Sequence, residues 1–226
     1  MHNGTITTNR ITIRGIGSRN LFGTAKIRAY YEDIPLTDGS GISTIEDIDL
    51  NTLGRIEVLK GPSSSVYGSG LGGTIQLIPD KGLFTTNYIS TSYSLGSFGL
   101  QKYLFQSDIG NSNNNAKITY SNLQREGYRK NNDTKRQSIS VASNHFINNS
   151  NKLTFVGAFT DLKAYIPSSL NLDDYTNDPT SAAYTWGRSQ GFENYKRALF
   201  GLSWNHNYTD KTLQKTSVFG SFLDAY

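Results

Sequence analysis

The stretch RIEVLKGPSSSVYGSGLGG, residues 55–73, decides how this chain is interpreted. A short charged strand runs into a loop rich in glycine and serine, and the apolar run TIQLI at residues 74–78 follows. Clustered glycine, serine and proline mark turns between strands. The stretches IRGIGSR (13–19) and YYEDIPL (30–36) have the same character. We therefore expect residues 1 to about 82 to form a small mixed α/β unit.

One segment of this unit carries a helix signal. GISTIEDIDLN, residues 41–51, has Ser43 three residues before Glu46, which is the spacing of a capping box. The sequence predicts a short helix here. Asp47, Asp49 and Asn51 also mimic the start of a calcium loop, but Thr52 replaces the required glycine and Glu57 comes one residue early. We interpret these side chains as the surface of a helix and a turn.

From residue 87 onward the hydrophobic pattern has a period of two, which indicates half-buried strands. Aromatic or aliphatic side chains alternate with small polar ones. One face is expected to carry a first set of mostly aromatic or aliphatic side chains, and the opposite face Ser, Thr, Gly and Asn. The first set is Ile89, Thr91, Tyr93, Leu95, Tyr103, Phe105, Ile109, Leu153, Phe155, Phe159, Phe200, Leu202 and Trp204. Such small polar faces suit a lumen or a wet interior.

The connections between these strands alternate in length. Short polar turns are expected at 111–115, 148–151 and 209–211, and longer loops at 125–136 and about 164–194. Short turns at one end and long loops at the other are typical of a β-barrel in the bacterial outer membrane. About seven strands are predicted, too few for a closed barrel, since single-chain bacterial barrels have an even number from about 8 upward. We therefore expect this chain to be part of a larger barrel, cut at both ends.

Composition agrees with strands that are apolar on one face only. Hydrophobic residues make up 36% and aromatic residues 12% of the 226 residues, and charged residues only 18%. The formal charge of +4 shows no basic stripe of the kind that binds nucleic acid. Residues 1–10 lack the pattern of a signal peptide and no apolar run approaches about 20 residues, so entry into a membrane would be as strands, with an export signal upstream.

Motifs for catalysis and metal binding are weak throughout. Gly68, Gly70 and Gly73 satisfy GxGxxG, but a β-branched run follows instead of the helix that a dinucleotide fold requires. The chain has no cysteine, and its three histidines are scattered. The serines at 63–65 lack a nucleophile elbow and are expected in a turn. We expect no enzyme activity, no cofactor and no metal site in the chain itself, although a transported ligand could be a metal chelate.

The quoted stretches, taken together, resemble the second half of the plug domain of TonB-dependent outer-membrane receptors. IRGIGSR, a DGxPL-like element at YYEDIPL, RIEVLKGPSSSVYG and the glycine pair before TIQLI occur in the family's order. SLGSFG (94–99) and REGYRKN (125–131) are similar to the first barrel strands and loop of the family. The resemblance implies a plug at residues 1–82 and the N-terminal portion of the barrel at 83–226. Glu32-Asp33 stands where the family usually has Asp-Gly.

The resemblance also implies roles for individual residues. Arg14 and Arg55 would lock the plug to two glutamates of late barrel strands that lie outside this chain, and forked donors to carboxylates make a strong but breakable latch. Ligands would meet plug apices and external loops. By that similarity, and because exposed loop aromatics offer binding surface, the ligand contacts are expected at Asn20, Leu21, Phe22, Thr37, Asp38, Tyr67, Tyr184, Trp186 and Arg188.

The function implied by the resemblance is active uptake of a scarce, bulky solute across the bacterial outer membrane. Ferric siderophores come first, and cobalamin or another solute remains open. The partners would be outer-membrane lipid and the TonB-ExbB-ExbD complex, whose contact box lies outside this sequence. The alternative is a secreted or surface β-rich binding protein, such as an adhesin or a lectin-like module, which would bury Phe155, Phe200 and Trp204 and remain soluble without detergent.

Overall fold

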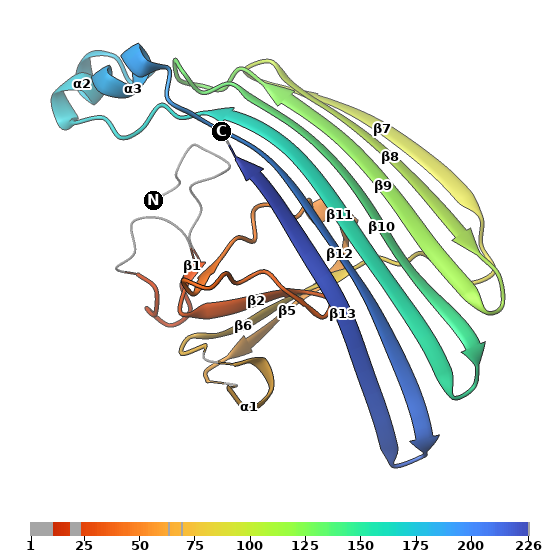
Figure 1. Cartoon of the computed structure of the whole chain (residues 1–226). Coiled ribbons are helices and arrows are strands. Elements are labelled where there is room, and N and C mark those ends of the chain that lie inside the picture. The colour runs from red at the N-terminus through yellow and green to blue at the C-terminus, as the bar shows by residue number, and fades with distance from the viewer. Residues whose placement is uncertain (1–10, 19–23, 63, 69, 226) are drawn as a thin grey trace.

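The computed structural model describes residues 11–18, 24–62, 64–68 and 70–225, which form a small N-terminal unit and one large curved sheet (Figure 1). The N-terminal unit is built on a four-stranded sheet with the strand order β3-β2-β6-β5. Strands β2 (Ile27–Tyr31) and β6 (Gly73–Pro79) pair in parallel at its centre, while β3 (Ile34–Pro35) and β5 (Leu53–Lys60) are antiparallel edges. Strands β1 (Thr24–Ala25) and β4 (Ile42–Ser43) form a separate small ladder.

The glycine at the start of β6 has a steric reason. Gly73 has φ of +132°, and a Cβ atom there would lie 2.1 Å from the carbonyl oxygen of Leu59. Only glycine allows β5 and β6 to approach this closely after the loop that contains α1 (Ser64–Tyr67). The quoted stretch therefore forms the strand, loop and strand that its pattern predicts.

The helix predicted within residues 41–51 is wrong. Ser43 ends strand β4, where its hydroxyl donates to the carbonyl of Ile27 at 2.7 Å, so it cannot cap a helix. The helix that follows in this segment is the short 3₁₀ helix η1 (Leu50–Thr52), which Asp49 caps by accepting from the amide of Asn51. Pairing of β4 with β1 satisfies the backbone that a helix would otherwise have used.

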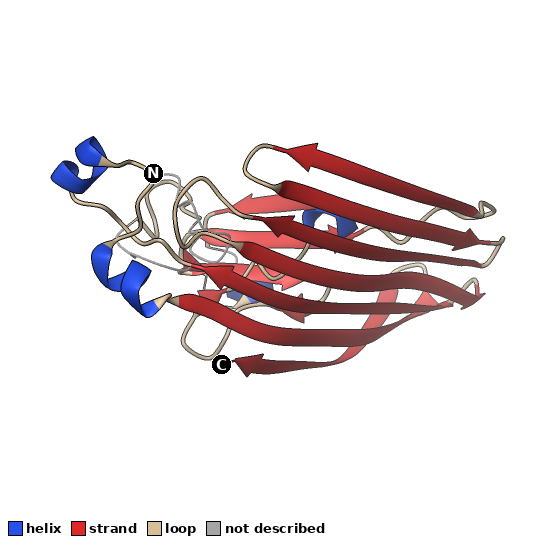
Figure 2. Cartoon of the chain, turned by 90° about the horizontal axis from the view of Figure 1, so that it is seen from above, coloured by secondary structure: helices blue, strands red, loops and turns tan. Residues whose placement is uncertain are grey.

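The large sheet contains seven antiparallel strands in sequence order (Figures 1 and 2). They are β7 (Tyr88–Gly96), β8 (Leu100–Gly110), β9 (Asn114–Arg125), β10 (Thr134–Asn148), β11 (Asn151–Tyr165), β12 (Phe192–Thr209) and β13 (Thr212–Ala225). The predicted number of strands is confirmed, and so are the short turns at 111–113, 149–150 and 210–211 and the longer loops at 126–133 and 166–191. The loop after β11 carries α2 (Leu172–Asn177) and α3 (Tyr184–Ser189). Among the described residues, no helix has the length and apolarity needed to span a bilayer.

The two faces of the large sheet differ as the period of two predicts. Phe155, Phe200 and Leu202 are exposed on the convex face, whereas Thr154, Thr160 and Ser203 are buried on the concave face. Figure 1 shows the N-terminal unit lying against this concave face. A β-sandwich, the architecture of the alternative function, would have covered the aromatic face instead.

Candidate functional site: the contact between the N-terminal unit and the large sheet

An apolar core joins the N-terminal unit to the large sheet. Ile34 of the unit packs against Gly201 of β12, where a Cβ atom would lie 2.9 Å from the isoleucine side chain. Ala142, Val156 and Leu199 of the sheet belong to the same buried cluster as Ile27 and Leu77 of the unit. The lack of a side chain at Gly201 thus lets Ile34 approach the sheet closely, and polar contacts add to this core.

Asp47 is the centre of the largest polar contact. It lies between β4 and η1, is only 6% exposed, and receives hydrogen bonds from side chains of three strands. Its carboxylate accepts from the Tyr195 hydroxyl at 2.5 Å and from the Arg197 guanidinium. Its backbone carbonyl accepts from Arg136 and from Thr160, both at 2.9 Å. One residue of the N-terminal unit is thus tied to β10, β11 and β12.

The local sequence explains why Asp47 points at the sheet. Ile48, its neighbour, is 3% exposed, and its amide donates to the carbonyl of Ile45 at 3.1 Å in a tight turn. The turn directs Asp47 toward the concave face of the large sheet, where Arg197 also donates to the hydroxyl of Thr44 at 2.5 Å. The earlier interpretation of Asp47 as solvent-facing helix surface is therefore wrong, because its partners are supplied by distant strands.

Glu46, next to Asp47, has its pKa raised to about 7, mainly by burial, with the carboxylates of Asp47 and Glu193 adding repulsion. A carboxyl whose pKa is higher in the folded state loses stabilisation as pH rises. The contact is therefore expected to weaken between about pH 4.5, the ordinary value, and about pH 7. We predict that Glu46→Gln leaves stability unchanged at acid pH and raises it at pH 8, measured by thermal unfolding across this range. A constant difference at every pH would contradict the assignment.

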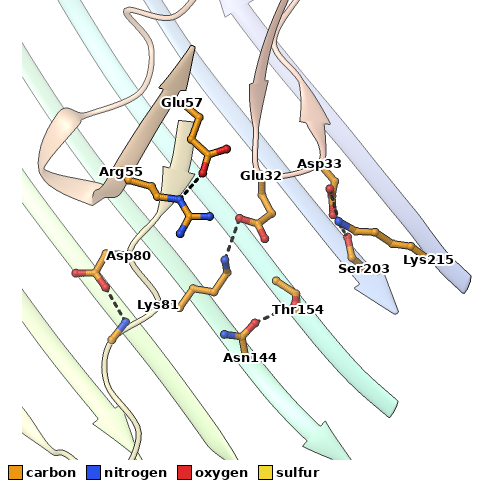
Figure 3. Close-up of polar contacts among 11 residues, drawn as sticks. Glu32, Asp33, Arg55, Glu57, Asp80, Lys81, Asn144, Thr154, Ser203 and Lys215 are labelled. Carbon is orange, nitrogen blue, oxygen red and sulfur yellow. Dashed lines mark hydrogen bonds and ion pairs between the residues drawn. The ribbon is translucent and has the colours of Figure 1, made fainter. Parts of the chain in front are cut away.

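A second contact uses the turn that departs from the family pattern. Glu32 has φ of +53°, a left-handed conformation that glycine adopts more easily. Both turn carboxylates nevertheless find partners (Figure 3): Glu32 pairs with Lys81 at 2.9 Å, and Asp33 accepts from Lys215 at 2.5 Å and from Ser203 at 2.8 Å. The strained turn thus presents charge to β12 and β13.

A third contact holds the linker that follows β6. Lys117 of β9 donates to Asp80 at 2.8 Å and lies 3.3 Å from Asp108 of β8. Asn115 donates to the carbonyl of Gly82 at 2.8 Å. Burial disfavours the charged form of Asp80, but the hydrogen bond and charge of Lys117 outweigh it and hold the pKa of Asp80 below its usual value. The linker is therefore fixed to the wall of the sheet.

The predicted latch residues lie elsewhere. Arg55 is exposed on β5 and pairs with Glu57 of the same strand at 2.7 Å (Figure 3). Arg14 is exposed and has φ of +50°. Among the described residues, neither arginine forms a hydrogen bond or ion pair with the large sheet. The polar contacts between the N-terminal unit and the sheet are instead made by Asp33, Asp47, Asp80 and their neighbours. Their pairing with glutamates outside this chain stays a prediction.

The predicted ligand residues of the N-terminal unit fall in separate places. Asn20, Leu21 and Phe22 lie outside the described residues. Thr37 and Asp38 belong to one turn, in which Asp38 accepts from the amides of Ser40 and Ile42 at 2.9 and 3.0 Å. Tyr67 ends α1, and its carbonyl accepts from the Tyr30 hydroxyl at 2.9 Å. Figure 1 shows α1 on the far side of the unit from α2 and α3, so Tyr67 does not join the loop residues.

Tyr184, Trp186 and Arg188 come together on α3. The Arg188 guanidinium donates to the Tyr184 hydroxyl at 2.8 Å and lies over its ring at 5.5 Å. Tyr184 is 71% exposed, whereas Trp186 packs on Gly191, where a Cβ atom would lie 2.3 Å from its ring. The helix therefore presents an aromatic and cationic surface suited to a planar or anionic ligand.

Two polar residues that the sequence did not single out hold this loop in place. Arg129 donates to the carbonyls of Ser168 and Ser181 at 2.5 and 2.9 Å, and Asn131 donates to those of Ile166 and Gly191 at 2.8 and 3.1 Å. A hollow of about 440 Å³ opens beside Arg129, between Tyr128 and Tyr175. The run REGYRKN was recognisable only as a loop, because its partners are backbone atoms 35 to 60 residues away.

Comparison with known proteins identifies the N-terminal unit and gives the fold of the whole chain. Residues 2–74 match the family model of the TonB-dependent Receptor Plug Domain. The ferric citrate transporter FecA in its unliganded form has 15% sequence identity and a TM-score of 0.82, over 100% of this chain and 35% of that chain.

Two further receptor structures have the same fold. The ferric yersiniabactin uptake receptor FyuA from Yersinia pestis has 16% identity and a TM-score of 0.75, over 99% of this chain and 36% of its own. The siderophore receptor PiuA from Acinetobacter baumannii has 14% identity and a TM-score of 0.70, over 100% of this chain and 32% of its own. This chain thus spans about a third of the length of the structures that it matches.

These matches agree with the architecture. The N-terminal unit is a plug that lies against the concave face of an open, antiparallel sheet, and that sheet has the fold of receptor barrel strands. The convex face carries exposed aromatic side chains, as the outward face of an outer-membrane barrel does. Residues 2–74 therefore match the plug domain of TonB-dependent receptors, and the chain as a whole has the fold of the plug and first barrel strands of such receptors.

Proposed function

We propose that this chain supplies the plug (residues 1–82) and the first barrel strands (83–226) of a receptor that takes up a scarce, bulky solute across the outer membrane. The observation that carries the proposal is the seating of the plug on the lumen face through polar contacts centred on Asp47. A plug held by hydrogen bonds and ion pairs closes the lumen, and these contacts can break and re-form. An energy-coupling partner of the TonB-ExbB-ExbD type would supply the work of displacement.

A ferric siderophore is the proposed substrate. Several structures of the same fold are described as ferric citrate, ferric yersiniabactin or siderophore receptors. The aromatic and cationic surface of α3, with Tyr184 and Arg188, suits a chelate that combines aromatic rings with negative charge. Cobalamin and a copper ligand are the competing substrates, the latter because a copper transporter has the same fold at a TM-score of 0.65.

Uptake by cells tests the proposal. A strain without the gene and the same strain carrying the gene would be given radiolabelled ferric siderophore under iron limitation, with and without a protonophore. Uptake that requires both the gene and the proton-motive force is expected. Gene-dependent uptake that persists with the protonophore would contradict an energy-coupled receptor. If loss of the gene left the uptake of ferric chelates, cobalamin and copper unchanged, a role in the uptake of these solutes would be contradicted.

Binding of the substrate is read separately from transport. The chain has two tryptophans, Trp186 on α3 and Trp204 on the convex face. We predict that a bound ferric chelate quenches the fluorescence of the purified receptor and that Trp186→Phe reduces this quenching more than Trp204→Phe does. Quenching that survives Trp186→Phe would place the ligand away from α3. A secreted adhesin or lectin-like protein is not favoured, and such a protein would stay in solution without detergent.

A further inference from the structure

The convex face of the large sheet is organised in level rows, because each strand pairs with the next in continuous register. Three rows are mainly apolar and form a belt around the sheet. Its upper row, on the side of the long loops, is Phe105, Tyr120, Ile139, Phe159, Ala198 and Phe222. This belt matches the lipid-facing band of an outer-membrane barrel.

Two polar rows lie directly above the belt, toward the long loops. The first contains Asp161 and Lys196, which are paired at 3.8 Å, together with Gln137 and Asp224. The next row, here called the lysine row, is Gln101, Gln124, Lys135, Lys163 and Asn194. Its two charges have the same sign, and no carboxylate stands in this row.

Lys135 and Lys163 face each other across β10 and β11 as register partners, so their side chains leave the same face of the sheet. Both side chains are exposed, and within the described residues neither forms a hydrogen bond or an ion pair. Like charges directly opposite each other destabilise a strand pair. An anion placed between the two ammonium groups would turn this repulsion into attraction.

The position of the lysine row indicates where such an anion would be. The Lys163 ammonium lies 5.2 Å from the ring of Tyr165 and 5.0 Å from that of Phe192, so the side chain extends toward the loop end. Aromatic residues at this height form the girdle at the membrane surface, and lysines above the apolar band reach for the headgroups. The loop end of an outer-membrane barrel is the external end. The two ammonium groups therefore lie at the headgroup level of the outer leaflet.

We infer that Lys135 and Lys163 bind the phosphate group of a lipid of the outer leaflet. Two ammonium groups offer charge-assisted hydrogen bonds to the phosphate oxygens, and the amides of Gln124 and Asn194 in the same row offer neutral donors beside them. The apolar belt below the row contacts the acyl chains of the same lipid. Lys196 is not part of the site, because Asp161 already pairs with it. The inference depends on the location in the membrane and not on the substrate of uptake.

Native mass spectrometry of the receptor in mild detergent tests this site. The probes are bisphosphorylated lipid A and the same lipid after removal of its phosphates. Wild-type protein is expected to retain the phosphorylated form, and Lys135→Gln/Lys163→Gln is expected to reduce that retention on the order of tenfold or more, since each lysine near a charged membrane surface contributes substantially. Lys135→Arg/Lys163→Arg is expected to restore it.

Lys152→Gln/Lys211→Gln is the matched control, since it removes the same charge near the short turns. Equal retention by the Lys135→Gln/Lys163→Gln protein would overturn the proposal, and so would an equal loss in the control. Excess inorganic phosphate distinguishes the source of the anion: displacement of the lipid at comparable affinity would mean a small-anion site rather than a lipid site.

Discussion

Replacing Asp47 with alanine is expected to loosen the plug more than any other single change in this unit. The substitution removes the carboxylate that accepts from Tyr195 and Arg197, and leaves a guanidinium that is mostly enclosed without its counter-charge. Breaking a buried ion pair by removing one partner costs about 3–5 kcal/mol, because the remaining charge stays desolvated. The plug would then detach from β12 more often and for longer.

Hydrogen exchange of the protein in detergent measures this effect. Amides of residues 44–52 are expected to exchange about 100-fold faster or more in Asp47→Ala, following from a loss of about 3 kcal/mol or more. The carbonyl of Asp47 would still accept from Arg136 and Thr160, so exchange in β10 should change less. Asp47→Asn keeps an acceptor oxygen without the charge, so its exchange rate in residues 44–52 is expected to lie between those of wild-type protein and Asp47→Ala.

Glu57→Ala provides the matched control for Asp47→Ala. It also removes one carboxylate from the plug, but the pair that it breaks with Arg55 is exposed, with 66% and 47% of the side chains accessible. Exposed pairs contribute about 0–1 kcal/mol. Equal protection in Asp47→Ala and wild-type protein, or an equal loss in Glu57→Ala, would contradict the role of Asp47.

The strands were predictable because their signal is local. On β11 the side chains of Leu153, Phe155 and Phe159 lie on the convex face, and this alternation can be read without knowing which strand lies beside it. Turns such as 148–151 contain residues that favour turns for their own conformational reasons. The number of strands, the two faces and the loop lengths were therefore accessible from the sequence alone.

The contacts that seat the plug were not predictable in the same way. Tyr195 and Arg197 are 148 and 150 residues from Asp47, so no local pattern links them. The capping-box spacing of Ser43 and Glu46 pointed to a helix, but Ser43 is fully buried beside Ile27, and strand pairing decided the conformation. The family resemblance pointed to Arg14 and Arg55 as the latch, and only the folded lumen face shows that Asp47 and Asp33 also bind the sheet.

Lys117→Met is expected to release the linker from the barrel wall and to invert its response to acid. In wild-type protein the ammonium of Lys117 separates Asp80 from Asp108, whose side chain is only 5% exposed. Methionine has similar length but no charge, so two carboxylates would face each other, one of them buried. The expected cost is about 3–5 kcal/mol, the range for a buried pair that has lost one partner.

The pH dependence distinguishes this mechanism from a simple packing defect. The pKa of Asp80 is below its usual value in the folded protein, so the contact is fully present above about pH 4 and is lost as pH falls further. In Lys117→Met the carboxylates repel each other at neutral pH, and stability should rise as acid protonates them. Thermal unfolding in detergent between pH 4 and pH 8 follows both trends.

Lys102→Met is the control. Lys102 lies on the same face of β8 as Asp108, but it has no ion pair among the described residues. Adding Asp80→Asn and Asp108→Asn to Lys117→Met should recover most of the lost stability at neutral pH. A loss of stability that does not depend on pH, and that these two changes do not recover, would show that Lys117 acts through packing and not through its charge.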